Sequence, residues 1–424
     1  MPRSVPSAGP RRRGLRNIGF SKRTIFRLAF AFAGLVIFAG CQHNPVYPDI
    51  GSVYIYSDPD KAEVLMDGQM LRLITPVKID GIPVGLHTFT LRHNNYKVMN
   101  FTMEVKPGQT RTVYKKLSTI SLQRKDTLSI SAGDMDLTSE GVIFLTNLWS
   151  GNITIARIAD NGQISTIDQI DVGAPQRLIA ANESANRVFV TRQKPDGEED
   201  LVGLEILSHK IIRSIYLNNI KHYSALAISP DGNILAAADS LNKRLVLIDS
   251  RLCTVIKTIS TTGFPTDLSF DRNNSLQIYV TQSGINRFDL VNLETGEVAN
   301  SVATGNSPGG IFWNNHCTQV GFCNRTDITY TVVNIGNWTT ATSGQDVVGK
   351  IIVGACWSSS DVYVLWAMDH NVGIMYIPNW QQTSKIYNYV PVGGGQLVEI
   401  SLTGDQRYLL MLNDAQLVTV ELGL

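Results

Sequence analysis

The residues of this chain that could carry out chemistry are spread along it rather than gathered in one motif. Four cysteines and four histidines lie beyond residue 200: Cys253, Cys317, Cys323, Cys356, His209, His222, His316 and His370. The chain has no HExxH helix and no phosphate-binding loop of the G-x-x-x-x-G-K-[ST] form. These residues therefore predict no cofactor, and any site has to be assembled from distant segments by the fold.

The spacing of the cysteines argues against one disulfide and against a metal centre. Cys317 and Cys323 bracket an expected strand, which would separate their Cα atoms by about 20 Å at about 3.3 Å per residue. A disulfide needs Cα atoms roughly 4.4–6.8 Å apart, so we do not expect these two to pair. A zinc site formed with His316 is the alternative, but the pair lacks CxxC spacing. Cys356 falls on an expected inner strand and is interpreted as a core residue.

The chain is basic at its N-terminus and acidic elsewhere. Residues 1–40 contain eight Arg or Lys and no Asp or Glu, whereas the remainder has 29 basic and 36 acidic residues, a net charge of −7. An acidic protein is poorly suited to binding phosphate backbones. We therefore expect no nucleic-acid partner.

The basic residues precede an apolar run from Leu28 to Ala39, which ends at Phe38-Ala39-Gly40-Cys41. This pattern is typical of a signal peptide and is too short to span a membrane comfortably. The residues around Cys41 resemble the lipobox of bacterial lipoproteins. The resemblance implies a signal peptide over residues 1–40, a lipid anchor on Cys41 and a tether over residues 41–50. Because Gln42 stands where Asp would signal inner-membrane retention, the resemblance favours the outer membrane and leaves its periplasmic or surface side open.

Residues 51–118 alternate between apolar and polar types, with turn signals such as Asp67-Gly68, and predict a compact all-β domain of six or seven short strands. The segment resembles the PEGA domain in four places: Ser57-Asp58-Pro59, Val64 to Gly68, Thr75-Pro76-Val77 and Ile82 to His87. The four-residue motif for which the PEGA family is named is not kept, because this chain reads Pro59-Asp60-Lys61-Ala62 at that place. We expect His87 and His93 to face solvent rather than bind a metal ion.

A strand-rich unit recurs along residues 119–424 at a step of about 40–50 residues, the length of a four-stranded propeller blade. In one unit the expected strands cover residues 226–229, 234–238, 245–249 and 254–259. The next unit contains Tyr279-Val280-Thr281, and this triplet with its relatives resembles the YVTN family of β-propeller repeats. The resemblance implies a seven-bladed β-propeller. A β-solenoid is the alternative, but solenoids use shorter coils.

The two ends of the repeat predict how a circle of blades would close. Residues 396–422 hold only three strands, whereas residues 119–130 supply one strand ahead of the first unit. We expect the early strand to complete the last blade and so to remove an exposed sheet edge. The fold class is therefore all-β, a small PEGA-like domain followed by a seven-bladed propeller closed by an N-terminal strand.

The connections between blades and the loops between second and third strands of each blade share one face in this architecture. That face would gather the candidate ligand-binding residues around the mouth of a channel: Asp134, Arg177, His222, Tyr223, Asp267, Pro308 and Gln396. An acidic loop over residues 193–200 would extend from the same face. Trp313 and Trp357 each end an inner strand, and we expect them to pack between blades rather than form an aromatic platform for a sugar or peptide.

Two functions fit these features. The first is a non-enzymatic, lipid-anchored platform of the bacterial envelope that binds a protein or glycan partner. The second is a hydrolase or lyase that uses His222, Asp267 and Arg177 at the channel mouth. A stoichiometric envelope partner would favour the first function, whereas loss of an activity in His222→Ala, or a bound metal, would favour the second.

Overall fold

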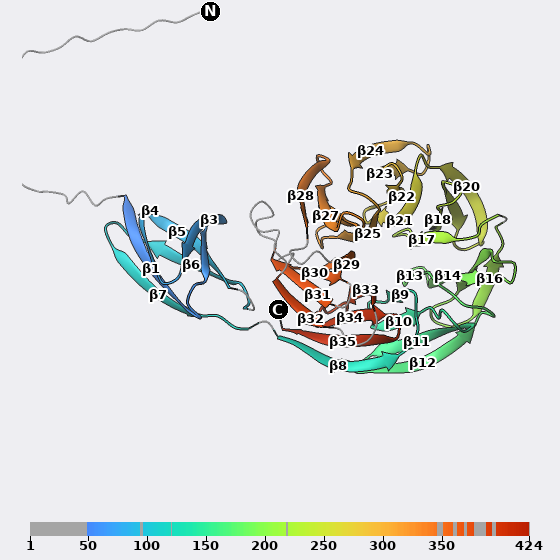
Figure 1. The fold of residues 1–424 in the computed structure, drawn as a ribbon, viewed down its shortest axis with the longest axis horizontal. Coiled ribbons are helices and arrows are strands. Elements are labelled where there is room, and N and C mark those ends of the chain that lie inside the picture. The colour runs from blue at the N-terminus through green and yellow to red at the C-terminus, as the bar shows by residue number, and fades with distance from the viewer. Residues whose placement is uncertain are drawn as a thin grey trace, which may run out of the picture. The chain divides into compact units, whose positions relative to one another are not determined.

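The computed structural model describes residues 49–93, 96–119, 121–217, 219–345, 351–358, 363–368, 371–376, 387–391 and 396–423. The expected signal peptide, Cys41 and the tether up to residue 48 lie outside the described residues. The described part of the chain is all-β (Figure 1) and contains no helix that is long and apolar enough to cross a membrane.

The N-terminal segment forms seven strands in two sheets, as expected for residues 51–118. One sheet has the order β4-β1-β7 and the other the order β3-β2-β5-β6. The strands are β1 (Ile50–Asp58), β2 (Glu63–Met66), β3 (Gln69–Ile74), β4 (Val77–Pro83), β5 (Gly85–Arg92), β6 (Met99–Val105) and β7 (Thr110–Lys116). Alternate residues of β1, such as Val53 and Ile55, are fully buried, which agrees with the period-two pattern in the sequence.

The expectation that His87 faces solvent is wrong. Asp67 and Gly68 form the two-residue turn between β2 and β3 with positive φ angles of 50° and 78°. Asp67 also continues the pairing of β2 with β5, since its N–H donates to the Thr88 carbonyl at 2.8 Å. The Asp67 carboxylate lies 2.6 Å from His87 Nδ1 and accepts the Thr88 N–H at 2.8 Å. The side chain of His87 is only 13% exposed. The His87 hydrogen bond, the largest cause, lowers the pKa of Asp67.

The described residues beyond 120 form seven four-stranded antiparallel sheets that follow one another in the sequence. The first four are β9–β12 (Met135–Leu137, Val142–Leu145, Asn152–Ile158, Ile164–Asp171), β13–β16 (Ile179–Asn182, Arg187–Gln193, Glu199–Leu204, Ile211–Ile215), β17–β20 (Tyr223–Ile228, Ile234–Asp239, Arg244–Asp249, Thr254–Ser260) and β21–β24 (Phe264–Asp271, Asn274–Ser283, Arg287–Asn292, Val298–Ala303). The last three are β25–β28 (Pro308–Trp313, Gln319–Asn324, Thr329–Asn334, Thr339–Gln345), β29–β32 (Ile352–Trp357, Tyr363–Met368, Asn371–Tyr376, Tyr387–Pro391) and β33–β35 (Leu397–Leu402, Tyr408–Asn413, Gln416–Gly423) with β8 (Ser121–Ser129).

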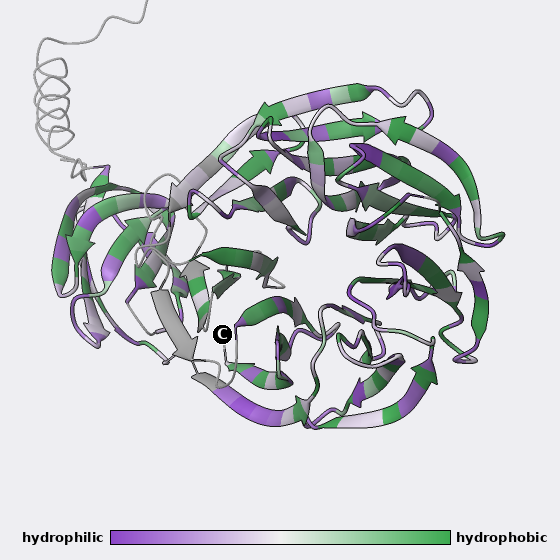
Figure 2. Ribbon diagram, turned by 45° about the vertical axis from the view of Figure 1, so that its right-hand side comes forward, coloured by the Kyte–Doolittle hydropathy of each residue, from purple (hydrophilic) through white to green (hydrophobic). Residues whose placement is uncertain are grey.

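Each of seven apolar clusters joins two neighbouring sheets. Within each sheet the middle strands carry continuous buried runs, as in β10 and β30, whereas the fourth strands β20 and β24 are mostly exposed. This pattern is expected for strands covered on both faces. Figure 2 shows many hydrophobic residues, coloured green, on the strands. Six clusters join consecutive sheets, and the seventh places Ile143 and Leu145 of the first sheet against Leu410 and Leu412 of the last. The circular order (Figure 1) is compatible with the predicted propeller.

The predicted role of the early strand is confirmed, because β8 forms the outer strand of the last sheet. It pairs antiparallel with β35 in a register that places Leu128 opposite Leu417 and Thr127 opposite Val418. A salt bridge of 2.6 Å between Lys125 and Glu421 joins the same two strands. The seventh sheet thus combines segments from both ends of the repeat region and leaves β35 without a free edge.

Candidate functional site

Most of the candidate residues precede or begin first strands, and Asp267 lies within one of them, β21. In each sheet the start of the first strand lies beside the end of the second, as shown by the pairing of Met135 with Leu145, Tyr223 with Asp239 and Pro308 with Asn324. We call this side of the sheets the connection face. It consists of the links between successive sheets and the loops between second and third strands.

Several of the candidate polar groups join neighbouring sheets rather than point into open space. The carboxylate of Asp134 accepts the Ile179 N–H at 2.8 Å, and that of Asp267 accepts the Ile311 N–H at 2.7 Å. The Asp267 bond runs from one first strand to the next, and Asp134 makes the equivalent bond from the residue just before β9. Burial is the largest cause of the raised pKa of Asp267, and its hydrogen bonds oppose the shift. These two carboxylates therefore act first as links in the fold.

Arg177 and His222 meet at Glu199. Arg177 contacts both carboxylate oxygens of Glu199 at 3.3 Å and donates to the Tyr223 carbonyl, while the Tyr223 N–H donates to Glu199 at 2.7 Å. His222 Nδ1 lies 3.8 Å from Glu199, and its side chain is 53% exposed. Burial and then the Arg177 charge lower the pKa of His222, which Glu199 opposes. No contact joins Asp267 to this group in the described structure.

The side chain of Tyr223 lies in the core and not on the connection face. Its ring is fully buried among apolar residues of the second and third sheets, and its hydroxyl has no hydrogen-bond partner among the described residues. Burial is the largest cause of its raised pKa. Only the backbone of Tyr223 takes part in the cluster with Arg177 and Glu199. Gln396, which precedes β33, is exposed on this face.

The loop expected over residues 193–200 is shorter and less acidic than predicted. The hairpin ladder continues to the pair Gln193–Glu199, so only residues 194–198 form the loop. Asp200 is fully buried and binds Arg192 at 2.6 Å. Within the loop Lys194 contacts Asp196 at 3.2 Å and Glu198 at 2.9 Å. Two of the expected loop carboxylates, Glu199 and Asp200, therefore belong to β15.

Three carboxyl groups gather where the seventh sheet meets the first. Glu399 hydrogen-bonds with Asp134 and accepts the Met135 N–H at 3.0 Å, while Asp136 accepts the Ala181 N–H at 2.6 Å. Withdrawal from water is the main cause that raises the pKa of Asp134 to about 7, that of Asp136 to about 6 and that of Glu399 well above its usual range. The state in which Asp134 and Glu399 are both charged is therefore disfavoured in the folded chain.

Trp149, which was not predicted as a site residue, is the most exposed aromatic side chain of the described residues. The indole is 80% exposed and lies in the loop between β10 and β11, on the connection face. The loop is held in place because Asn147 Oδ1 accepts the N–H groups of Trp149 and Ser150, each at 2.9 Å. Gln176 in turn accepts the Asn147 N–H at 3.2 Å. A large aromatic side chain thus stands exposed on an ordered loop.

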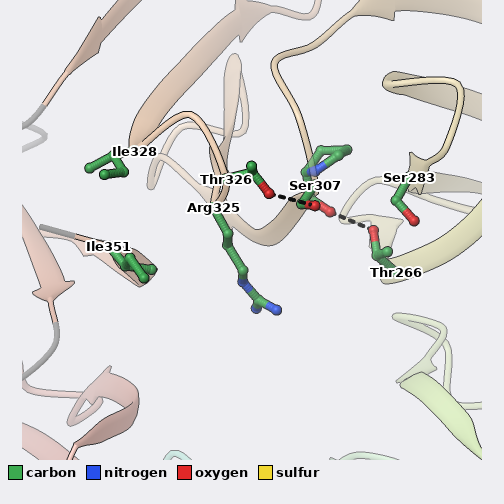
Figure 3. A pocket seen from close by; sticks show the side chains of 8 residues that line it. Thr266, Ser283, Ser307, Arg325, Thr326, Ile328 and Ile351 are labelled. Carbon is green, nitrogen blue, oxygen red and sulfur yellow. Dashed lines mark hydrogen bonds between the residues drawn. The ribbon is translucent and has the colours of Figure 1, made fainter.

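A pocket of about 520 Å³ opens on the connection face beside the fourth and fifth sheets (Figure 3). Its lining combines four hydroxyl side chains, one arginine and three apolar residues: Thr266, Ser283, Ser307, Thr326, Arg325, Pro308, Ile328 and Ile351. Figure 3 shows Arg325 extending between Ile351 and Thr266. Pro308 was among the predicted site residues, whereas Arg325 and the serines were not. A signal was available in the segment 305–309, which has the Gly-x-Ser-x-Gly pattern.

The Gly-x-Ser-x-Gly segment does not have the surroundings of a catalytic serine. Such a serine requires a following helix and a base, but Ser307 is followed by β25. Its hydroxyl accepts a hydrogen bond of 2.9 Å from Thr326. Ser307 has a φ of +55° in the link between the fourth and fifth sheets. We interpret it as a pocket residue and not as a nucleophile.

The two tryptophans that were expected to pack between blades are buried, and Cys356, which was expected in the core, lies partly buried against an apolar cluster. Trp313 and Trp357 are 6% and 4% exposed, and each packs in a cluster between two sheets. Cys323 and Cys356 also contact core clusters, and burial raises the pKa of Cys323 to about 12. Cys317 and Cys323 are both free thiols. Among the residues with described positions, no group of three or more His, Cys, Asp or Glu could hold a metal ion.

The family comparison finds a match in the N-terminal domain. The family described as PEGA domain matches residues 50–121, so this segment is similar to that domain over nearly the predicted range of 51–118. A comparison with curated proteins found no match to the chain.

Proposed function

We propose that the chain is a lipid-anchored protein of the bacterial envelope that presents the connection face to a protein or glycan partner without catalysing a reaction. In this proposal Cys41 carries the lipid in the outer membrane, and residues 119–424 form a seven-bladed β-propeller of the YVTN type. The N-terminal sequence pattern supports the anchor. Seven consecutive four-stranded sheets joined by seven apolar clusters support the propeller.

The exposed indole of Trp149 carries the proposal of a binding face. Aromatic side chains that stand exposed on ordered surfaces are enriched among the residues that dominate binding energy. Because the loop is fixed by Asn147, little conformational entropy has to be lost when a partner covers the indole. The links made by Asp134 and Asp267 hold the first strands of neighbouring sheets together beneath this face.

The binding proposal is tested by crosslinking in intact cells. A photoreactive amino acid at position 149 should capture one saturable protein or glycan partner. The same amino acid at Leu207, which is 84% exposed in a loop between third and fourth strands on the opposite side of the sheets, should not. Equal capture at positions 149 and 207 would contradict a binding face. So would unchanged capture by a photoreactive amino acid placed beside position 149 in a Trp149→Ala variant.

The anchor is tested separately by metabolic labelling with a palmitate analogue. The protein should carry the label and fractionate with outer membranes, and Cys41→Ser should abolish both properties. A labelled Cys41→Ser variant would rule out the proposed anchor site.

A hydrolase or lyase on the same face is the second candidate, and the pair of His222 and Glu199 is the observation that favours it. A half-exposed imidazole with a lowered pKa beside a carboxylate is suited to accept a proton. In this candidate Glu199 would replace Asp267 as the carboxylate of the site, because the Asp267 carboxylate already accepts the Ile311 N–H. An activity that His222→Ala abolishes while folding is retained would favour this candidate.

A further inference from the structure

The pocket beside the fourth and fifth sheets contains an exposed cation, Arg325, that forms no ion pair with a described residue. Its charge acts at longer range on the buried Asp267 carboxyl, whose pKa is raised mainly by burial and lowered in part by Arg325. Arg325 follows β26, and two carboxylates near it are engaged elsewhere. Asp327 accepts the backbone and side-chain N–H groups of Asn306 at 2.6 and 2.8 Å, and Asp267 accepts the Ile311 N–H. The five N–H donors of the guanidinium therefore remain available to a ligand.

Two hydroxyl groups beside Arg325 can also serve a ligand. Thr266 donates its proton to the Pro308 carbonyl, and Thr326 donates its proton to Ser307. The proton of Ser307 is thus left to be donated, and Ser283 makes no side-chain hydrogen bond to any described residue. The pocket therefore offers one planar cation and two neutral donors that can also accept.

The remaining wall of the pocket is apolar. Pro308, Ile328 and Ile351 line it, and Ile351 is 44% exposed. Ile328 has a φ of +57°, a conformation in which a β-branched side chain is a genuine outlier. In the two preceding sheets the residue before the third strand is Lys243 or Asn286 with a φ of 50°. An apolar side chain is kept here although the backbone disfavours it, as occurs at ligand-binding positions.

We propose that this pocket binds a glycan through a uronic acid residue. Arg325 pairs with the sugar carboxylate, since the planar guanidinium fits a carboxylate with two parallel hydrogen bonds. Ser283 and Ser307 bind the ring hydroxyls, and Ile328 and Ile351 cover the C–H face of the ring. A volume of about 520 Å³ accommodates one or two sugar rings. The inference rests on the proposed function and specifies the ligand class on the same face.

The test is calorimetric titration of the purified full-length chain with trigalacturonic acid and with its methyl ester, in which each carboxylate is replaced by a neutral ester that carries one additional methyl group. The free acid should bind at least about tenfold more tightly than the ester, because a tenfold difference corresponds to about 1.4 kcal/mol, which a charge-assisted hydrogen bond can supply. Arg325→Gln should weaken binding of the free acid to the level of the ester. Arg251→Gln should not, since it removes an equal charge from an exposed arginine in the loop between β19 and β20.

Equal affinity for acid and ester, or no binding of either, would overturn the inference. Stronger competition by inorganic phosphate or by an acidic tripeptide than by free galacturonate would also overturn it, because the pocket would then recognise another anion. Thermal unfolding of Arg325→Gln checks that the variant folds. Crosslinking at position 149 does not use the pocket, so a partner captured there while uronate fails to bind would reject this inference and leave the proposed binding face standing.

Discussion

Glu399 and Met135 are 264 residues apart in sequence, yet the Glu399 carboxylate accepts the Met135 N–H at 3.0 Å. This bond joins the first strand of the seventh sheet to the first strand of the first sheet. It complements the pairing of β8 with β35, which joins the same region along its outer edge. Because Glu399 also hydrogen-bonds with Asp134, the junction depends on a pair of carboxyl groups that cannot easily both be charged.

The carboxyl pair predicts that the protein loses stability as the pH rises through the range from about 5 to 7. The pKa of Asp134 is raised to about 7 and that of Glu399 lies well above its usual range, whereas carboxyls of the unfolded chain titrate near pH 4. Between these values the folded chain holds a proton that the unfolded chain has lost, which amounts to about 1.4 kcal/mol per pH unit. The Tm should therefore drop by several degrees from pH 5 to pH 7.5.

Glu399→Gln isolates this contribution from other titrating groups. The amide still accepts the Met135 N–H and can donate to Asp134, so the Tm of the variant should change less with pH than that of the unmodified protein. Glu140→Gln removes an exposed carboxylate from the turn between β9 and β10 and should leave the pH dependence as it was. If Glu399→Gln kept the full pH dependence, the carboxyl pair would be excluded as its source.

Asp267 is predicted to stabilise the fold rather than to bind a ligand. Asp267→Ala leaves the Ile311 N–H without its acceptor, which should cost about 1–3 kcal/mol in free energy of unfolding. Asp267→Asn keeps an acceptor oxygen and should recover part of that loss. Denaturant unfolding of the three proteins measures the difference. A fully stable Asp267→Ala that no longer captures a partner would reverse the assignment.

The sequence was sufficient to predict the sheets because they follow from local patterns. Three strands at one end and one strand at the other could be counted, and their pairing as β35 and β8 follows from the need to cover a sheet edge. The resemblance to the YVTN repeat is weaker between residues 307 and 388 than in the other units, but β26 and β30 there still have continuous buried runs. The buried apolar pattern of the strands is thus retained where the repeat motif is hard to recognise.

The site was predicted less well because side-chain direction depends on features that a sequence pattern does not reveal. Near the start of β17 a bulge shifts the register between Tyr223 and Ala225, and a one-residue slip exchanges the two faces of a strand. Tyr223 therefore lies inward. Glu199 was assigned to a loop because the length of the β14–β15 hairpin was unknown. Arg325 carries no motif, and only the pocket identifies it.

Among the tryptophans with described positions, Trp149 is predicted to be the most strongly quenched by acrylamide. Its indole is 80% exposed, whereas Trp313, Trp357 and Trp366 are 6% exposed or less. Trp149→Phe should remove a rapidly quenched component from the emission, and Trp313→Phe should leave that component in place. A Stern–Volmer analysis of the two variants measures the difference. Unchanged quenching in Trp149→Phe would mean that the indole is covered in solution.

Ile328 is predicted to lower the stability of the fold and to strengthen ligand binding in the pocket. A β-branched residue with φ of +57° costs about 1–2 kcal/mol relative to one that tolerates this conformation. Ile328→Asn should therefore raise the Tm by about 2–4 °C, because Asn adopts positive φ more readily. The same change removes an apolar wall of the pocket and should weaken uronate binding several-fold.

Ile328→Val is the matched control for this substitution. Valine is also β-branched, so the unfavourable backbone conformation stays and most of the apolar wall is kept. Its Tm and its affinity for trigalacturonic acid should both remain close to those of the unmodified protein. If Ile328→Asn gained stability and bound the ligand unchanged, Ile328 would not contact it. If Ile328→Asn gained no stability, the backbone at this position would not be strained, and the reason for an apolar residue there would have to be packing alone.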